Sequence, residues 1–303
     1  METTTTLRSA PRDVEAIDLA NRLARQTHQL EARNAELQQS AARTLAGVQA
    51  LLCNIVDLYN PHLGGHGRRV AALVVEFGEA LKLGPQTLQA LRAAGLFHDL
   101  GMLGLRRERL YTPWAELSDN ERSLMLSHPE IGASQLELVP EWAATRAAVV
   151  GHHERWDGSG FPGHLARDAI PLAARVLSIC DTYDEMLHKP AAAPRRFSED
   201  EVLEHLRRQR GRQHDPELVE RFLEMLALRA GGAGAVASRP EVALMLDRVP
   251  EGVRLSRDIH NRAHMVLLAK GTLLRHAHVL RLRALRDEHA VIEPVYVVAP
   301  DAA

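Results

Sequence analysis

Apolar residues recur every seven positions between residues 13 and 58 of this chain. Leucine occupies one position of the repeat, broken only at Thr44, and small or branched residues occupy the position three residues earlier. The two sets are Leu23, Leu30, Leu37, Leu51 and Leu58, and Ala20, Thr27, Asn34, Ala41, Val48 and Ile55. This seam is narrower and more regular than the apolar stripe of a helix on a globular core, so the pattern favours a coiled coil.

Asn34 adds a prediction about how the coil is paired. It lies at an inner position of the repeat, where two asparagines satisfy each other only if two parallel helices are in register. We therefore expect residues 13–58 to form a coiled-coil helix that joins two copies of the chain in a parallel homodimer. A helix packed against a globular core is the alternative.

The pattern beyond Leu58 predicts further helices as far as about residue 230. Gly64 and Gly65 are expected to precede the helix that holds His66, and Gly84-Pro85 to start the helix that ends in His98-Asp99. Ser118 and Glu121 have the spacing of a capping box. Short turns between amphipathic helices predict a compact helical bundle.

Gly231-Gly232-Ala233-Gly234 interrupts the helical pattern and marks the expected domain boundary. Short β-like runs follow at 242–246, 265–268 and 295–298, with a helix near 276–287, which predicts a small α+β module. The expected fold is therefore mainly α. Its predicted parts are a disordered N-terminus (1–12), the coiled-coil helix (13–58), an all-helical domain (50–230), a Gly/Ala-rich linker (231–240) and the accessory module (241–303).

Composition narrows the class of protein. The chain has 303 residues, of which 46% are hydrophobic, and a formal net charge of −2, so there is no basic excess to indicate DNA binding. Cys53 and Cys180 are its only cysteines, which argues against a disulfide framework. The N-terminus has no hydrophobic signal region, and no stretch was expected to approach a membrane span. We expect a cytoplasmic protein with no membrane contact.

Candidate chemistry is concentrated in histidines and aspartates. His152 and His153 are adjacent and precede a glycine-rich turn, and His98-Asp99 forms an earlier pair. Three further candidates fall at the ends of predicted helices, namely His66, His128 and Asp181. Any one of these histidines could be solvated or hydrogen-bonded without a ligand, since the chain has 16. As a set they predict a metal site.

Five histidines and two aspartates make a nitrogen and oxygen set with no thiolate, which suits iron, manganese or zinc. Seven ligands are too many for one ordinary ion. A carboxylate such as Asp99 can bridge two metals, so the set indicates at least a binuclear centre of the kind that hydrolyses phosphate esters.

The order of these residues, with Asp157-Gly158-Ser159-Gly160-Phe161-Pro162 after the tandem histidines, resembles the HD-GYP family, a branch of the HD phosphohydrolases. The match runs from about residue 50 to 225. It implies an all-helical HD domain that cleaves the phosphodiester of cyclic di-GMP, or of a related cyclic dinucleotide, with a metal-activated hydroxide.

The resemblance also implies roles for the ligands. Asp99 would be the bridge and the catalytic carboxylate between two divalent ions, iron or manganese being expected. His66, His98 and Asp181 resemble the family's ligands for the first metal, and His128, His152 and His153 those for the second. His62 stands where some members have a glutamate that binds a third ion, so it is a candidate third-metal ligand.

The substrate side departs from the family pattern. The usual Gly-Lys after His-Asp is Gly101-Met102 here, and the usual Lys-Pro-Gly is 112–114, Thr-Pro-Trp. The tyrosine of the family's signature is Phe161, and a later cationic run is shortened at 189–192. A methionine cannot donate a charge-assisted hydrogen bond to a phosphate. Fewer cationic side chains are therefore expected around the substrate phosphates than in the family. The expected substrate-binding residues are Arg69, Asp157, Gly158, Gly160, Phe161, Pro162, Arg175 and Lys189.

Two functions of different classes follow. The complete ligand set favours a metal-dependent cyclic-dinucleotide phosphodiesterase, of reduced activity if nothing replaces the missing cations. The thinned cation set favours instead a metal-binding signalling scaffold or nucleotide sensor with little or no turnover. A generic HD nucleotidase is a third, weaker alternative. In the family a coiled-coil helix often follows a receiver or sensor domain, and none is expected here. The input signal is therefore expected to come from the coil, from the C-terminus or from a separate signalling protein, which is a possible partner.

Overall fold

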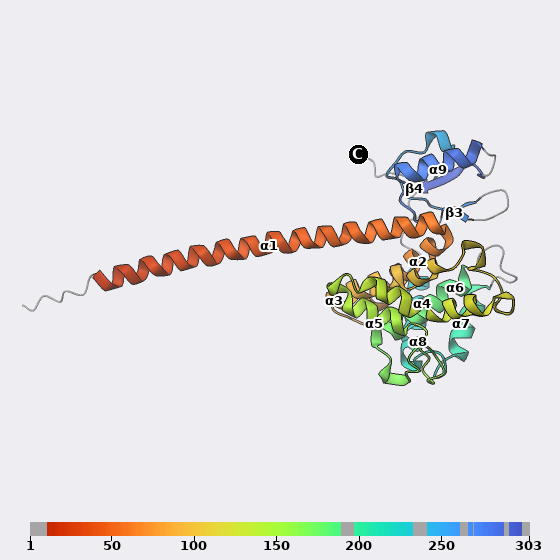
Figure 1. Ribbon diagram of the computed structural model, residues 1–303, viewed down its shortest axis with the longest axis horizontal. Helices are drawn as coiled ribbons and strands as arrows, with labels where there is room; N and C mark the ends of the chain where they lie inside the picture. Colours follow the sequence, from red (N-terminus) through yellow and green to blue (C-terminus); the bar gives the residue numbers. More distant parts are fainter. Residues whose placement is uncertain are drawn as a thin grey trace, which may run out of the picture. The chain divides into compact units, whose positions relative to one another are not determined.

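The computed structural model describes residues 11–188, 197–232, 241–260, 266–268, 270–287 and 291–298. The chain forms two compact units, residues 1–52 and 53–303. The α-helices are α1 (Pro11–Tyr59), α2 (Pro61–Ala80), α3 (Pro85–Phe97), α4 (Asp119–Leu136), α5 (Ala143–Gly151), α6 (Leu172–Leu187), α7 (Glu199–Arg208), α8 (Pro216–Gly232) and α9 (His276–Asp287). Figure 1 shows this mainly helical chain, as the sequence predicts.

Helix α1 is continuous through the predicted heptad region. The leucines of the repeat are exposed along it, from 50% for Leu58 to 63% for Leu30. By length and composition alone, Ile17–Tyr59 could also cross a membrane, since an 18-residue window within it has a mean hydropathy of 1.2, with 11% of that window buried. The expectation that no stretch approaches a membrane span was therefore wrong, because the leucines and alanines of the heptad seam also raise the mean hydropathy.

The core of the helical domain forms where α2, α3, α5 and α6 pack on one another. Large side chains from several helices are fully buried there, among them Phe77, Phe97, Leu177 and Phe222. Their burial supplies the main stabilisation of the domain, at about 1.5–3 kcal/mol for each large apolar side chain. The same packing fixes the helix ends that carry the candidate ligands.

Two glycines let α2 and α3 approach closely. A Cβ on Gly95 would lie 2.6 Å from the Cα of Ala71, and one on Gly67 would lie 2.9 Å from a backbone oxygen of α3. Side chains at these positions would force the helices apart. The close crossing brings His66, next to Gly67, beside His98, three residues after Gly95.

The predicted start of the His66 helix was wrong. Helix α2 begins at Pro61 and contains Gly64 and Gly65, because Asn60 caps it: the Asn60 side chain accepts hydrogen bonds from the backbone N–H groups of His62 and Leu63. Gly64 is needed inside the helix, since a Cβ there would overlap the buried carboxylate of Asp57. The glycines therefore mark a close approach rather than a turn.

Other local predictions are confirmed. Helix α3 begins at Pro85 after Gly84, and Ser118 and Glu121 form a complete capping box at the start of α4. Cys53 and Cys180 are free thiols, Cys53 half-buried and Cys180 buried. Short 3-10 helices connect the longer ones; they are η1 (Leu100–Gly104), η2 (Arg107–Arg109), η3 (Trp114–Glu116), η4 (Pro140–Trp142), η5 (Arg167–Ala169) and η6 (Leu246–Arg248).

The C-terminal module is a small α+β unit. Strands β1 (Glu241–Leu244) and β4 (Val295–Val298) pair antiparallel, as do β2 (Ile259–His260) and β3 (Val266–Leu268). Together with α9 they cover a core of their own that includes Leu246, Leu274 and Leu282. The predicted helix 276–287 and strand 295–298 match α9 and β4. Met265, most of the predicted linker and most of the predicted disordered N-terminus lie outside the described residues.

Candidate metal centre

Three buried side chains from three helices meet at the first group of candidate ligands. His66 comes from α2, His98 follows the last residue of α3, and Asp181 comes from α6. The Nε2 atoms of the two histidines are 3.2 Å apart, and Asp181 Oδ1 lies 3.0 Å from His66 Nε2 and 3.4 Å from His98 Nε2. The three donor atoms therefore face one small volume.

A second group lies beside the first. His128 of α4 and His152 at the end of α5 bring their Nε2 atoms within 3.3 Å, and His153 offers a third nitrogen within 4.8 Å of both ligand atoms. His128 and His152 are buried, while His153 is half-buried. The tandem histidines thus serve one group together, as their adjacency predicts.

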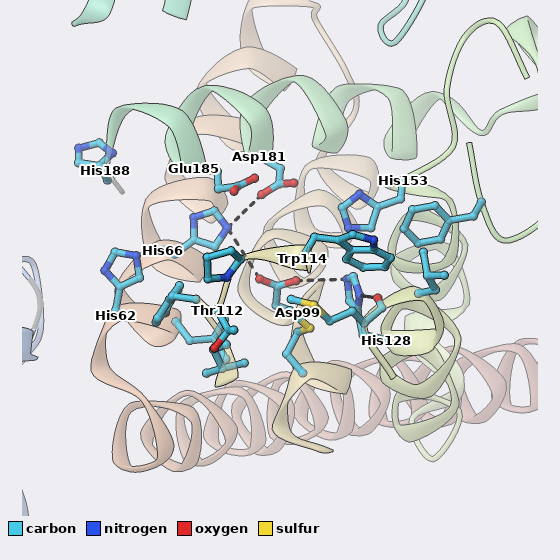
Figure 2. A pocket seen from close by; sticks show the side chains of 18 of the residues that line it. His62, His66, Asp99, Thr112, Trp114, His128, His153, Asp181, Glu185 and His188 are labelled. Carbon is cyan, nitrogen blue, oxygen red and sulfur yellow. Dashed lines mark hydrogen bonds and ion pairs between the residues drawn. The ribbon is translucent and has the colours of Figure 1, made fainter. Parts of the chain in front are cut away.

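Asp99 lies between the two groups, as the dashed lines of Figure 2 show. Its Oδ1 is 3.3 Å from His128 Nε2, whereas its Oδ2 is 3.5 Å from His98 Nε2 and 4.0 Å from His66 Nε2. Gly101 permits this position, because a Cβ on Gly101 would overlap the backbone carbonyl of His128. One carboxylate therefore presents one oxygen to each group, the arrangement of a bridging ligand.

Backbone carbonyls fix the orientation of three of the histidine rings. The Nδ1 atoms of His98, His128 and His152 lie 3.1, 2.5 and 2.6 Å from the carbonyl oxygens three residues earlier in each case. A carbonyl can only accept, so Nδ1–H must donate and the Nε2 of the neutral ring carries the lone pair. The lone pairs then point into the shared volume, as in histidines that bind metals.

His66 is oriented by a carboxylate that sequence reasoning missed. Its Nδ1 donates to Asp184 Oδ2 over 2.7 Å, and Arg69 holds the same carboxylate through Nε to Oδ1 at 2.8 Å and Nη2 to Oδ2 at 3.0 Å. Asp184 lies one helical turn after Asp181 on α6, and that spacing was the available signal. Such a carboxylate fixes the ring and raises its basicity toward a metal.

The electrostatics of the two groups suit a cation. Burial, helped by neighbouring histidines, lowers the pKa of His153 to about 4 and that of His152 well below 6.5, so both are neutral at pH 7. Burial would raise the pKa of Asp181, but hydrogen bonds from His66 and His98 hold it well below 3.8. Burial would lower the pKa of these two histidines, but the neighbouring carboxylates raise both above 6.5, so an ion bound at this group would displace their extra protons. Neutral imidazoles and ionised carboxylates are the forms that bind a divalent ion. The residues present therefore fit the two metals that the sequence predicts.

The loop after the tandem histidines is held by Glu154. This buried carboxylate accepts hydrogen bonds from the backbone N–H groups of Gly163 at 2.6 Å and Leu165 at 2.9 Å. Gly160 packs so closely that a Cβ would overlap the backbone of 153–155, and Gly158 adopts a φ of +79°. Phe161 then stacks on His153, with ring centroids 4.9 Å apart and planes 25° apart. The tight loop predicted from the glycines is confirmed.

A cavity of about 630 Å³ opens onto this centre (Figure 2). One side, the ligand wall, consists of His66, Asp99, His128, His153 and Asp181. Another, the apolar wall, consists of Met102, Leu110, Tyr111, Trp114, Met125 and Leu126. Within the part of the chain that the structure describes, no lysine or arginine lines the cavity.

Most of the expected substrate contacts lie outside this lining. Phe161 lines the cavity. Arg69 is held by Asp184, and Arg175 by Asp168 and the buried Asp215. The lining also omits the loop residues Asp157, Gly158, Gly160 and Pro162. Lys189 lies outside the described residues, and these substrate roles stay predictions.

His62 lines the cavity but belongs to neither ligand group. Its ring meets that of Tyr111 edge-on, with centroids 5.2 Å apart. Burial, and then the charge of Arg69, lowers the pKa of His62 to about 4. Its predicted role as a third-metal ligand stays a prediction.

Several curated proteins resemble this chain. A cyclic di-GMP phosphodiesterase of Vibrio cholerae is 29% identical over 208 residues, which are 62% of this chain and 41% of that protein. The 3′3′-cGAMP-specific phosphodiesterase 2 of the same organism is 30% identical, over 59% of this chain and 35% of its own length. The cyclic di-GMP phosphodiesterase response regulator RpfG of Xanthomonas campestris is 30% identical, over 75% and 58%.

The chain spans only 35% to 58% of the length of these relatives. A family model described as HD domain matches residues 50–218, which hold all seven of the candidate ligands. The chain therefore belongs to the HD domain family, and its resemblance to the HD-GYP branch is confirmed.

Proposed function

We propose that this protein is a metal-dependent phosphodiesterase of cyclic dinucleotides, with cyclic di-GMP as the first candidate substrate. The observation that carries the proposal is the position of Asp99, with one carboxylate oxygen toward each of two groups of three candidate ligands. A centre of this form is suited to hydrolysis of a phosphate ester.

We assign the first ion to His66, His98 and Asp181, the second to His128, His152 and His153, and the bridge to Asp99. Two divalent cations bound there would lower the pKa of a water and stabilise negative charge on the phosphate oxygens. Iron or manganese suits the nitrogen and oxygen donors, and the nearest cysteine, Cys180, is in neither group. The expected number is two, with His62 as the candidate for a third.

The chain's own residues have defined tasks in this proposal. Backbone carbonyls and Asp184 hold the imidazoles so that their lone pairs need not reorganise when substrate arrives. Phe161 packs flat on His153 and limits the movement of that ring. Once substrate covers it, the apolar wall would keep water away from the bound phosphate, which would strengthen electrostatic contacts there.

The substrate class rests on the relatives, whose names include both cyclic di-GMP and 3′3′-cGAMP phosphodiesterases. Both ligands combine a negatively charged diester with purine bases. The test is therefore run on both compounds, with metal-loaded full-length protein.

Hydrolysis of the two cyclic dinucleotides is compared in the wild type, His152→Ala and His28→Ala. His152 is a buried candidate ligand, whereas His28 is an exposed histidine on α1. The proposal expects turnover in the wild type and His28→Ala, and a loss of at least about 100-fold in His152→Ala because an unreplaced ligand frees an ion. No hydrolysis of either compound by a wild type that carries its metals would overturn it.

A second function is favoured by the cavity lining among the described residues, which holds no lysine or arginine. A metal-binding signalling scaffold or nucleotide sensor would keep the ligand wall and dispense with the contacts that hold substrate phosphates. It predicts full metal loading and measurable nucleotide binding, together with no turnover in the assay above.

We propose that α1 forms a parallel coiled-coil homodimer and that the protein acts in the cytoplasm. The exposed heptad leucines support pairing of two α1 helices. The polar Asn34 is more easily accommodated between two paired helices than in a lipid bilayer. The dimer would give a separate signalling protein a two-state element to act on. Light scattering on the full chain and on a chain truncated to begin at Val48 tests this: equal subunit numbers would exclude the coil as the dimer interface.

A further inference from the structure

Trp114 combines an exposed side chain with a place in the cavity of the candidate centre. Its side chain is 51% exposed, yet it lines the same cavity as Asp99, His128 and His153. Figure 2 shows the indole of Trp114 projecting into that cavity among these ligands. Tyr111 and Leu126, which are 43% and 45% exposed, line it as well. Single exposed apolar residues are ordinary, but several at one cavity indicate a binding surface.

The backbone that carries the indole is firmly held. Arg122 donates from Nε to the carbonyl of Trp114 and from Nη2 to that of Ala115, each over 3.1 Å. Its guanidinium lies 5.9 Å from the centroid of the indole, and the buried Leu117 closes η3 at its end. An exposed ring on a fixed backbone is pre-organised for a ligand, because little side-chain freedom is lost on binding.

The cavity also limits the chemistry of what binds beside Trp114. Since no lysine or arginine of the described chain lines it, the negatively charged part of a ligand has the metal centre as its partner. The rest of the ligand meets the apolar wall. A flat, aromatic group satisfies this wall best, and stacking of a base on an aromatic side chain is worth about 1–3 kcal/mol.

We propose that Trp114 is a specificity-determining residue that stacks on a purine base of the substrate while the phosphodiester lies at the metal centre. The assignment rests on the proposed function for the identity of the ligand. Stacking at 114 would add affinity at a cavity that no lysine or arginine of the described residues lines. The site would therefore select nucleotides by their base more than by their charge.

The test measures binding of GMP and of ribose 5-phosphate, which differ by the base, to metal-loaded full-length protein. Neither probe contains a diester, so binding is measured without turnover. The proteins are the wild type, Trp114→Leu, Trp114→Phe and Trp142→Phe. Trp142 is the matched control because it is buried against Phe97 and does not line the cavity.

The proposal expects GMP to quench tryptophan emission in the wild type and in Trp142→Phe but not in Trp114→Leu. In Trp114→Leu the Kd for GMP should rise by about tenfold, whereas the Kd for ribose 5-phosphate should not change. Trp114→Phe should bind GMP within a few-fold of the wild type, because it keeps an aromatic face.

Equal GMP affinity in the wild type and Trp114→Leu would overturn the assignment. Equal losses for both probes would overturn it too, since the substitution would then have disturbed the whole cavity. If cyclic dinucleotides are not hydrolysed but the base-dependent loss is found, the phosphodiesterase proposal fails and Trp114 remains a base-stacking residue of a nucleotide sensor.

Discussion

The ligand wall and the apolar wall of the cavity are built in different ways. In the ligand wall, buried helix ends and backbone carbonyls fix side chains that all present a lone pair or a negative charge. The apolar wall comes from the short 3-10 helices and turns between α3 and α4 and from α4 itself, and it includes exposed side chains such as Trp114 and Leu126. Metal binding and substrate binding therefore have separate structural supports in this protein, so one can be altered while the other persists.

The largest expected effect is on the ligand wall and comes from Asp184. Asp184→Asn removes the charge that holds His66 and Arg69, so metal affinity at the His66 group should fall by about 10- to 100-fold. Competition with a chelating dye measures the affinity of each ion. The second group should be unaffected.

Asp168→Asn is the matched control for that substitution. Asp168 also pairs with an arginine, Arg175, but its side chain is 87% exposed and lies outside both ligand groups. Similar metal affinities in the wild type and both variants would mean that Asp184 does not support the first group.

His214 is a buried histidine that belongs to neither wall, and its pKa shows the effect of burial on an imidazole that is not a candidate ligand. His214 is 2% exposed, and neither ring nitrogen has a hydrogen-bond partner among the described residues. Burial, together with the charges of His205 and Arg155, lowers its pKa to about 3. As the pH falls through 6.5 the unfolded chain takes up the proton first, so this group costs stability from about pH 6.5 down to about pH 3.

His214→Phe should remove that dependence while keeping a ring in the core. Between pH 7 and pH 5 the wild type should lose about 2 kcal/mol more unfolding free energy than the variant. Urea denaturation of both proteins at the two pH values measures the difference. Both proteins keep the ligand histidines, so the contributions of those histidines to the unfolding free energy cancel. Parallel losses would show that His214 is not neutral in the folded protein.

A smaller change is expected when a cation is added to the apolar wall. Met102 lines the cavity, and its N–H donates to the backbone carbonyl of Asp99 over 2.9 Å. If turnover is limited mainly because Met102 stands where the family has a lysine, Met102→Lys should raise turnover of cyclic di-GMP by about tenfold, through one charge-assisted phosphate contact. Steady-state kinetics of metal-loaded protein measures this.

Met245→Lys adds the same charge on an exposed methionine of the C-terminal module and should leave turnover unchanged. No gain in Met102→Lys, with a wild type already active, would mean that another cation of the full chain meets the phosphates. If the wild type and Met102→Lys both carry their metals and neither hydrolyses cyclic di-GMP, the scaffold function is favoured.

The sequence predicted features that depend on spacing along one element. The boundaries of α9 and β4, the capping box of Ser118 and both ligand groups follow from local patterns and from the family motif. Gly64 and Gly65 were misplaced because a helical glycine and a turn glycine look alike in sequence. Only the packing of Asp57 against Gly64 distinguishes them.

What the sequence could not predict depends on contacts between distant segments. Asp184 was missed because its partner His66 lies 118 residues away. The arginines Arg69 and Arg175 looked available for phosphates, but buried aspartates hold both. The apolar wall could not be predicted because it brings Met102 and Trp114, from the irregular segment before α4, to the same cavity as Met125 of α4.

The central claim is that Asp99 and the two ligand groups hold two ions in each chain. Elemental analysis of full-length protein, purified without oxygen after supplementation with iron and manganese, tests it most directly. Two transition-metal ions per chain are expected in the wild type and fewer in Asp99→Ala, which loses the bridge between the groups. Less than one ion per wild-type chain would contradict it.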